Sequence, residues 1–216
     1  MITRRKALTL AGIGLVGAGG VALPGGLPGF ADLGAASAQE ASAIEDVTLG
    51  DPDAPVKIVE YASYTCPHCA AFHNDTFKAF KTDYIDTGKV HFTYREVYFD
   101  RYGLWASMVA RCAGNDRYFG VADILYRTQG DWARQGEAAA VVESLKKIGA
   151  QAGLAPEAVD ACLQDAEMAQ GLVAWYEANA AADEVRSTPS FFINGELHSG
   201  NMSLDQIGAL VNEAAG

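Results

Sequence analysis

Hydrophobic residues between positions 56 and 98 follow a strand pattern, then a helix pattern, then a strand pattern again. The stretches "VKIVEYAS" (56–63) and "VHFTYREVY" (90–98) are rich in β-forming residues, and the second alternates between apolar and polar positions. Between them, the apolar residues that fall on one face at helical spacing are Cys69, Phe72, Phe77, Phe80 and Tyr84. The pattern therefore predicts a strand, a helix that ends at Gly88, and a second strand.

The next long segment has the periodicity of helices only. Stretches such as "LWASMVARCA", "EAAAVVESLKKIGA" and "AEMAQGLVAWYEANAAADE" carry apolar residues at helical spacing, and Pro156 suits the first position of a helix. Trp105, Trp132 and Trp175 are expected to fill the core of this segment, although some could line a groove for unfolded substrates. We predict an all-helical insertion over residues 100–185.

Strand character returns near the end of the chain. Asn194-Gly195 in "SFFINGELHS" is a strong signal for a two-residue hairpin turn. The final stretch "SLDQIGALV" begins with a capping box, Ser203 to Gln206, and predicts an amphipathic helix. The predicted fold class is thus α/β, with one domain formed by residues 39–99 and 186–216 and interrupted by the insertion. Residues 39–55 are expected to be a polar lead-in.

The first 38 residues have the features of an export signal. Arg4 and Arg5 precede an apolar, glycine-containing run, and "ASA" at 36–38 is a pattern that signal peptidases cut, so we expect cleavage before Gln39. The twin arginine favours a Tat-type signal, whereas Ala7 leaves Sec export open. A retained membrane anchor is the alternative to cleavage. The formal net charge of −11 argues against a nucleic-acid partner.

The stretch "YTCPHCAAFH" (64–73) carries the candidate chemistry. Cys66 falls where the first predicted strand ends and the helix begins, so the unpaired N–H groups and dipole of the helix favour its thiolate. A protonated His68 would add a positive charge. Stabilising the thiolate lowers the pKa of Cys66 and makes a Cys66–Cys69 disulfide an electron acceptor. Alternatives are half of a zinc site with His68 or His73, a structural staple, and a dithiol poised to reduce or isomerise.

"CPHC" after a strand, a large helical insertion and then "TPSFFING" together resemble the DsbA family of periplasmic disulfide oxidoreductases, within the thioredoxin superfamily. The resemblance covers roughly residues 46–216. It implies a thioredoxin fold, an exposed nucleophilic Cys66, a buried partner Cys69 and a thiolate-stabilising His68.

The resemblance also assigns roles outside the cysteine motif. Pro189 matches a cis-proline beside the cysteine pair, and Thr188 matches a residue that helps to bind the substrate backbone. Glu60 matches a buried acid that assists proton transfer near the inner cysteine, the alternative being a surface glutamate at an edge. His73 stands where relatives carry a second acid, and we expect it to be a surface residue of the helix.

Two cysteines remain once Cys66 is paired with Cys69, as the resemblance implies. Cys112 and Cys162 both lie in the predicted insertion, so we predict a structural disulfide between two of its helices. The alternative is two free buried thiols.

The sequence thus predicts an exported, periplasmic thiol:disulfide oxidoreductase that donates its disulfide to unfolded or reduced exported proteins. It is expected to act without a bound cofactor or metal. We also expect a monomer, because only about 17 residues separate the predicted cleavage site from the first strand, which leaves no room for a dimerisation module. The resemblance implies re-oxidation by a DsbB-like membrane quinone reductase. The alternatives are an isomerase or reductase on the same fold, or a non-catalytic periplasmic chaperone or zinc-binding protein.

Overall fold

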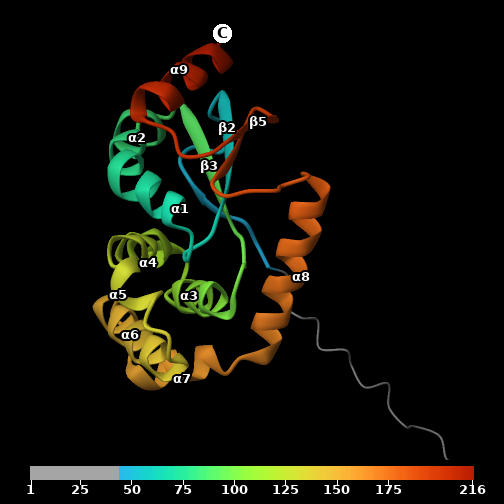
Figure 1. The fold of residues 1–216 in the computed structure, drawn as a ribbon. Coiled ribbons are helices and arrows are strands. Elements are labelled where there is room, and N and C mark those ends of the chain that lie inside the picture. Colours follow the sequence, from blue (N-terminus) through green and yellow to red (C-terminus); the bar gives the residue numbers. More distant parts are fainter. Residues whose placement is uncertain (1–43) are drawn as a thin grey trace, which may run out of the picture. The chain divides into compact units, whose positions relative to one another are not determined.

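The computed structural model describes residues 44–216, which form a sheet and a set of helices (Figure 1). The export signal predicted over residues 1–38 lies outside the described residues. The strands of the sheet are β1 (Val47–Leu49), β2 (Val56–Ala62), β3 (Val90–Glu96), β4 (Ser190–Ile193) and β5 (Glu196–Ser199). Their order is β1-β3-β2-β4-β5, and β2 pairs with β3 in parallel while the other pairs are antiparallel. Strand β2 is therefore central.

Strand β1 corrects the prediction that residues 39–55 are only a lead-in. Val47 is buried and pairs with Tyr94 of β3. The strand has three residues, and Gly50, with φ of +87°, ends it at once. A strand this short cannot show the alternation by which longer strands are predicted.

The segment after β2 contains two π-helical turns within the predicted helix. It runs as α1 (Pro67–Phe72), the π turn η1 (His73–Phe77), α2 (Lys78–Phe80) and the π turn η2 (Lys81–Ile85). Gly88 adopts φ of +75° just beyond it, which glycine tolerates at no steric cost. Because a π turn contains one more residue than an α turn, each one shifts the following side chains around the helix axis.

All helices of the predicted insertion lie between β3 and β4 in the chain. They are α3 (Arg101–Cys112), α4 (Asn115–Arg127), α5 (Gln129–Trp132), α6 (Ala138–Gln151), α7 (Pro156–Leu163) and α8 (Ala166–Ala182). Helix α8 runs from the helical group back to the sheet (Figure 1). Trp132 is fully buried, whereas Trp105 and Trp175 are partly buried. Cys112, at the end of α3, forms a disulfide with Cys162 of α7.

The chain ends with the predicted hairpin and helix. Asn194 and Gly195 both have positive φ, 46° and 91°, as a type I′ turn requires. The Asn194 Oδ1 atom accepts a hydrogen bond from the Lys57 backbone N–H at 2.8 Å, which ties the hairpin to β2. Helix α9 (Leu204–Ala214) begins with the capping box between Ser203 and Gln206.

The two faces of β2 have different neighbours. Glu60 points towards the helix that follows β2, where it meets His73. Tyr61 points to the other face, where its hydroxyl bonds to Asp183 at the end of α8. Because successive side chains of β2 point to opposite faces of the sheet, one face lies beside the cysteine motif and the other lies beside α8. Among residues 44–216, no helix has the length and apolar character needed to cross a membrane.

Candidate redox site

Cys66 occupies the junction between β2 and α1. Its backbone is extended, with φ of −82° and ψ of 121°, and it is the N-cap residue of α1. The side-chain amide of Gln129 donates to the carbonyl oxygens of Tyr64 and Cys66 at 2.8 and 2.9 Å. The Thr65 hydroxyl donates to Asp100 at 2.8 Å. The insertion and the loop after β3 therefore both fix the backbone around Cys66.

The two cysteines of the motif are both free thiols and differ in burial. The exposed fraction is 8% for Cys66 and 0% for Cys69. Cys66 is thus less open than the resemblance implies, and this expectation is corrected. Its Sγ atom lies beside the loop before β4, where it donates to the Thr188 carbonyl oxygen at 3.4 Å. The Thr188–Pro189 peptide bond in this loop is cis.

The environment of Cys66 lowers the pKa of its thiol to about 5. The largest cause is a hydrogen bond from the Cys69 thiol, and burial opposes it. The Thr188 side chain and the backbone N–H groups of Cys69 and His68 also favour the thiolate. The imidazole of His68 itself is exposed. His68 therefore acts on Cys66 here through its backbone, and a contribution from its ring charge stays a prediction.

Cys69 has the opposite tendency. Burial, the hydrogen bond to Cys66 and the negative charge of Glu60 all raise the pKa of the Cys69 thiol well above its ordinary value. The pair thus combines one sulfur that ionises easily with one that holds its proton. This asymmetry suits thiol–disulfide exchange, in which one sulfur attacks or leaves as a thiolate.

Glu60 and His73 form a buried hydrogen-bonded pair next to the cysteine motif. The His73 Nε2 atom lies 2.9 Å from one carboxylate oxygen of Glu60 and 3.2 Å from the other. Glu60 is 0% exposed and His73 is 8% exposed. Glu60 is therefore not a surface glutamate, because β2 is the central strand. The expectation that His73 is a surface residue is wrong, since a buried carboxylate requires a partner.

Further buried polar residues connect this region to the insertion. Tyr94 and Tyr126 share a hydrogen bond between their hydroxyls at 2.5 Å, and the His73 ring stacks on Tyr126 with 4.2 Å between ring centroids. Tyr118 donates to Glu96, which accepts two hydrogen bonds of 2.7 Å from the Arg111 guanidinium. This network was not predicted from the sequence, because its members are far apart in the chain and match no local motif.

An exposed aromatic residue and a buried hydroxyl lie near the cysteine motif. Phe99 is 61% exposed and neighbours Asp100, the residue that holds Thr65 beside Cys66. The Thr188 hydroxyl oxygen is buried and has no hydrogen-bond partner among the described residues. Cys112 and Cys162, by contrast, belong to the helical insertion and are bonded to each other.

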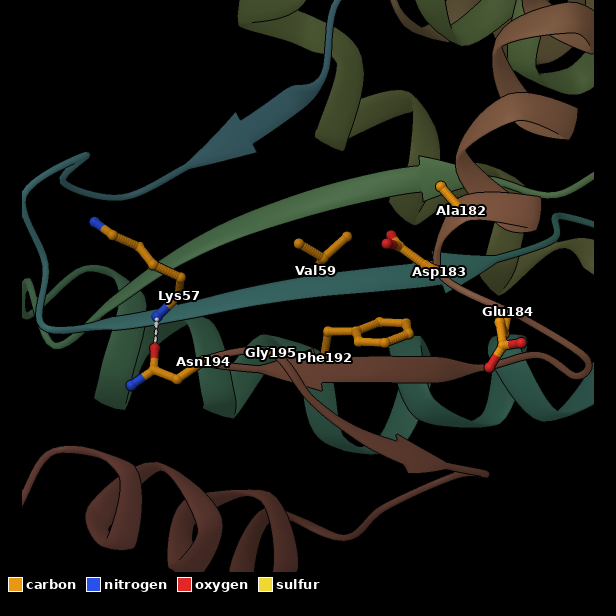
Figure 2. A pocket seen from close by; sticks show the side chains of 8 residues that line it. All are labelled: Lys57, Val59, Ala182, Asp183, Glu184, Phe192, Asn194 and Gly195. Atoms are coloured by element: carbon orange, nitrogen blue, oxygen red, sulfur yellow. Dashed lines mark hydrogen bonds between the residues drawn. The ribbon is translucent and has the colours of Figure 1, made fainter.

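The cavities that residues 44–216 form outside the cysteine motif include one beside β2 and one beside the helix that follows it. One, of about 710 Å³, lies on the face of β2 beside the end of α8 (Figure 2). Its lining residues are Lys57, Val59, Ala182, Asp183, Glu184, Phe192, Asn194 and Gly195. The other, of about 420 Å³, lies between α4 and the helix after β2 and reaches His73. The part of the chain that the structure describes holds no group of three or more His, Cys, Asp and Glu side chains arranged for a metal ion.

Comparison with known proteins agrees with this architecture. A family model described as "Thioredoxin" matches residues 42–213. A curated protein of Rickettsia bellii, named "Putative protein-disulfide oxidoreductase", is 36% identical over 170 residues, covering 78% of this chain and 64% of the relative. The chain therefore spans slightly under two thirds of the length of that relative.

Two solved structures have the same fold. Wolbachia pipientis alpha-DsbA1 is 29% identical with a TM-score of 0.74, over 79% of this chain and 91% of that chain. Oxidised BdbD from Bacillus subtilis is 22% identical with a TM-score of 0.70, over 79% and 92% of the two chains. These similarities confirm the predicted fold class, a thioredoxin fold interrupted by an all-helical insertion.

Proposed function

The chain belongs to the DsbA-like family of thioredoxin-fold disulfide oxidoreductases, and on this premise we propose that its Cys66–Cys69 disulfide oxidises reduced proteins exported from the cytoplasm. The observation that carries the proposal is the difference between the two sulfurs. The pKa of Cys66 is lowered to about 5, while that of Cys69 is raised. Stabilising the Cys66 thiolate stabilises the reduced form of the pair relative to the disulfide. The disulfide therefore accepts electrons readily.

The reaction proceeds in two exchange steps. A substrate thiolate attacks the Cys66 sulfur, the Cys66–Cys69 bond breaks, and the electron pair goes to Cys69, which takes up a proton. A second substrate thiolate then attacks the substrate sulfur of the mixed disulfide, and Cys66 leaves as a thiolate. The substrate loses two electrons and gains a disulfide, and the Cys66–Cys69 pair gains two electrons.

The surrounding residues have distinct proposed roles in these steps. Thr188 lies against the Cys66 sulfur, so this residue and Pro189 would position a substrate chain that approaches it. Glu60, whose charge acts on Cys69, would exchange a proton with that sulfur. Phe99 offers an exposed apolar contact near the site for unfolded chains.

The setting of the reaction follows from the family. DsbA-like proteins are extracytoplasmic, and we propose a periplasmic location with release of the predicted signal of residues 1–38. The chemistry needs no bound cofactor, because both electrons are held by the two sulfurs. We propose that a DsbB-like membrane quinone reductase restores the disulfide and meets the protein, as a monomer, through Cys66.

A transfer assay tests this function. The oxidised protein is mixed with a reduced, unfolded protein that contains two cysteines, and disulfides are counted in both by thiol alkylation. We expect stoichiometric transfer to the substrate, its loss in Cys66→Ala, and its retention in the matched variant Cys112→Ala/Cys162→Ala. Suppression of substrate aggregation without any transfer would instead identify a chaperone and contradict the proposal.

A further inference from the structure

The proton that Cys69 exchanges must cross a buried region. Cys69 and Glu60 are both 0% exposed, so the Cys69 sulfur and the Glu60 carboxylate are not in contact with bulk solvent. Each turnover nevertheless requires one proton to reach Cys69 when the disulfide is reduced and one to leave when it is re-formed. Burying a charge without compensation is costly, so this proton needs a defined path.

His73 is the residue that links Glu60 to an open space. Its Nε2 atom lies 2.9 Å from Glu60, and its side chain also lines the cavity of about 420 Å³ between η1 and α4. Glu60 does not line that cavity. In the described part of the chain, His73 is the only basic residue whose side-chain nitrogen lies within 4.0 Å of the Glu60 carboxylate. It also lies at the first position of a π turn, a feature often found at functional sites.

The other ionisable groups nearby are less suited to this exchange. Tyr94 and Tyr126 face the pair from β3 and α4, and burial raises the pKa of both well above the ordinary value, so they keep their protons. At the cavity, Lys78 and Lys81 come from the helix after β2, and Asp123 and Arg127 come from α4. Asp123 pairs with Arg127, and Lys81 pairs with Asp86.

We propose that His73 carries protons between Glu60 and the solvent of this cavity, and so couples the redox change of Cys69 to bulk water. The inference rests on the proposed function. When the disulfide is reduced, the electron pair of the broken bond stays on Cys69, and a proton from His73 passes through the Glu60 carboxylate to that sulfur, which leaves Glu60 a carboxylate again. Water in the cavity then reprotonates His73. Re-formation of the disulfide runs the same transfers in reverse, and His73 is a positioning residue that acts through Glu60.

The test separates the chemistry of the two sulfurs within one experiment. The reduced protein is mixed with dithiobis(nitrobenzoate), a disulfide reagent that releases a coloured thiolate, nitrothiobenzoate, when a thiolate attacks it. In the first phase the Cys66 thiolate attacks the reagent and releases one nitrothiobenzoate. In the second, Cys69 loses its proton, attacks the Cys66 sulfur and releases a second one. The rate of the second phase, measured across pH, reports the proton transfer from Cys69.

The variants are His73→Gln, which can still donate to Glu60 but carries no proton, and His73→Ala, which enlarges the cavity. We expect the first phase to be unchanged and the second to slow by about tenfold or more in both, since positioned proton transfer contributes about 10²–10⁴-fold. Added imidazole should restore the second phase in His73→Ala and leave His73→Gln slow. Thermal unfolding of each variant checks that it is folded.

Two results would overturn the inference while leaving the proposed function intact. One is a second phase with the wild-type rate and pH profile in both variants. The other is slowing that imidazole does not relieve in His73→Ala, which would give His73 a purely structural role. A wild-type protein without any second phase would overturn the proposed function itself, and this inference with it.

Discussion

The Cys66 sulfur lies 3.4 Å from the Thr188 carbonyl oxygen, although 122 positions separate the two residues in the chain. The helices α3 to α8 occupy the greater part of that interval and return the chain to the sheet at β4. The cis bond between Thr188 and Pro189 lies in the returning loop. The fold therefore places a loop from the end of the chain directly beside the sulfur that substrate thiolates attack in the proposed reaction.

The low pKa of Cys66 predicts that its thiolate persists in mildly acidic solution. The rate of alkylation of Cys66 in the reduced protein should change little between neutral pH and about pH 6, and should fall with a midpoint near 5. Cys69→Ala removes the largest cause of the lowered pKa. In this variant the midpoint of Cys66 alkylation should therefore move up towards the ordinary thiol value of about 8.5. A wild-type midpoint near that ordinary value would contradict the account.

The same shift predicts how the stability of the dithiol form depends on pH. The folded pKa lies below that of an unfolded thiol, so ionisation of Cys66 stabilises the folded dithiol form above about pH 5. This stabilisation grows as pH rises towards the unfolded value and is lost as pH falls through about 5. Denaturant unfolding measures the free energy of unfolding of the dithiol and disulfide forms. The difference between these two free energies should change with pH in this window, by about 1.4 kcal/mol per pH unit at most.

The Thr188 hydroxyl allows a second test of what lowers the pKa of Cys66. It is buried and has no hydrogen-bond partner within residues 44–216, and the Thr188 side chain favours the Cys66 thiolate. Thr188→Val, of nearly equal size, should raise the pKa of Cys66 by less than Cys69→Ala does, whereas Thr188→Ser should keep it low. The alkylation titration measures all three, and equal midpoints for Val and Ser would show that the hydroxyl has no part.

The ion pair between Glu96 and Arg111 should contribute strongly to stability. Both side chains are largely buried, at 1% and 13% exposed, and the pair joins β3 to α3. Glu96→Gln leaves Arg111 without its counter-charge and should lower the free energy of unfolding by about 3 kcal/mol or more. The control Asp123→Asn breaks a pair that is more than half exposed and should cost about 0.5 kcal/mol or less. Equal costs in denaturant unfolding would refute this.

The Cys112–Cys162 disulfide should affect stability and leave exchange intact. It closes a loop of 50 residues, for which chain entropy gives roughly 4 kcal/mol. Cys112→Ala/Cys162→Ala should therefore unfold at lower denaturant concentration and still transfer disulfides at temperatures where it is folded. Loss of transfer in the folded variant would mean that this bond takes part in the reaction.

The sequence predicted the parts of the fold that have a strong local pattern. The strands near 56–63 and 90–98, the Asn194-Gly195 turn and the capping box at Ser203 each follow from neighbouring residues. Strand β1 was not predicted, because a strand of three residues is too short to show an alternation of apolar and polar positions. The π turns were not predicted, because the apolar spacing in this segment was interpreted with the α-helical period alone.

The candidate site could be predicted only where a motif marks it. The cysteine pair and "TPSFFING" stand out in the sequence, but nothing near His73 reveals that Glu60, 13 positions away, needs a buried partner. The Tyr118–Glu96–Arg111 contacts likewise join residues from β3, α3 and α4. Such pairings are fixed by tertiary packing, which a single sequence does not display.

The most direct test of the central claim is the equilibrium of Cys66 and Cys69 with a glutathione redox buffer, followed by thiol alkylation. We predict that the pair remains a dithiol even in strongly oxidising mixtures, because the Cys66 thiolate is stabilised. A pair that becomes a disulfide in reducing mixtures would contradict it and would identify the protein as an electron donor.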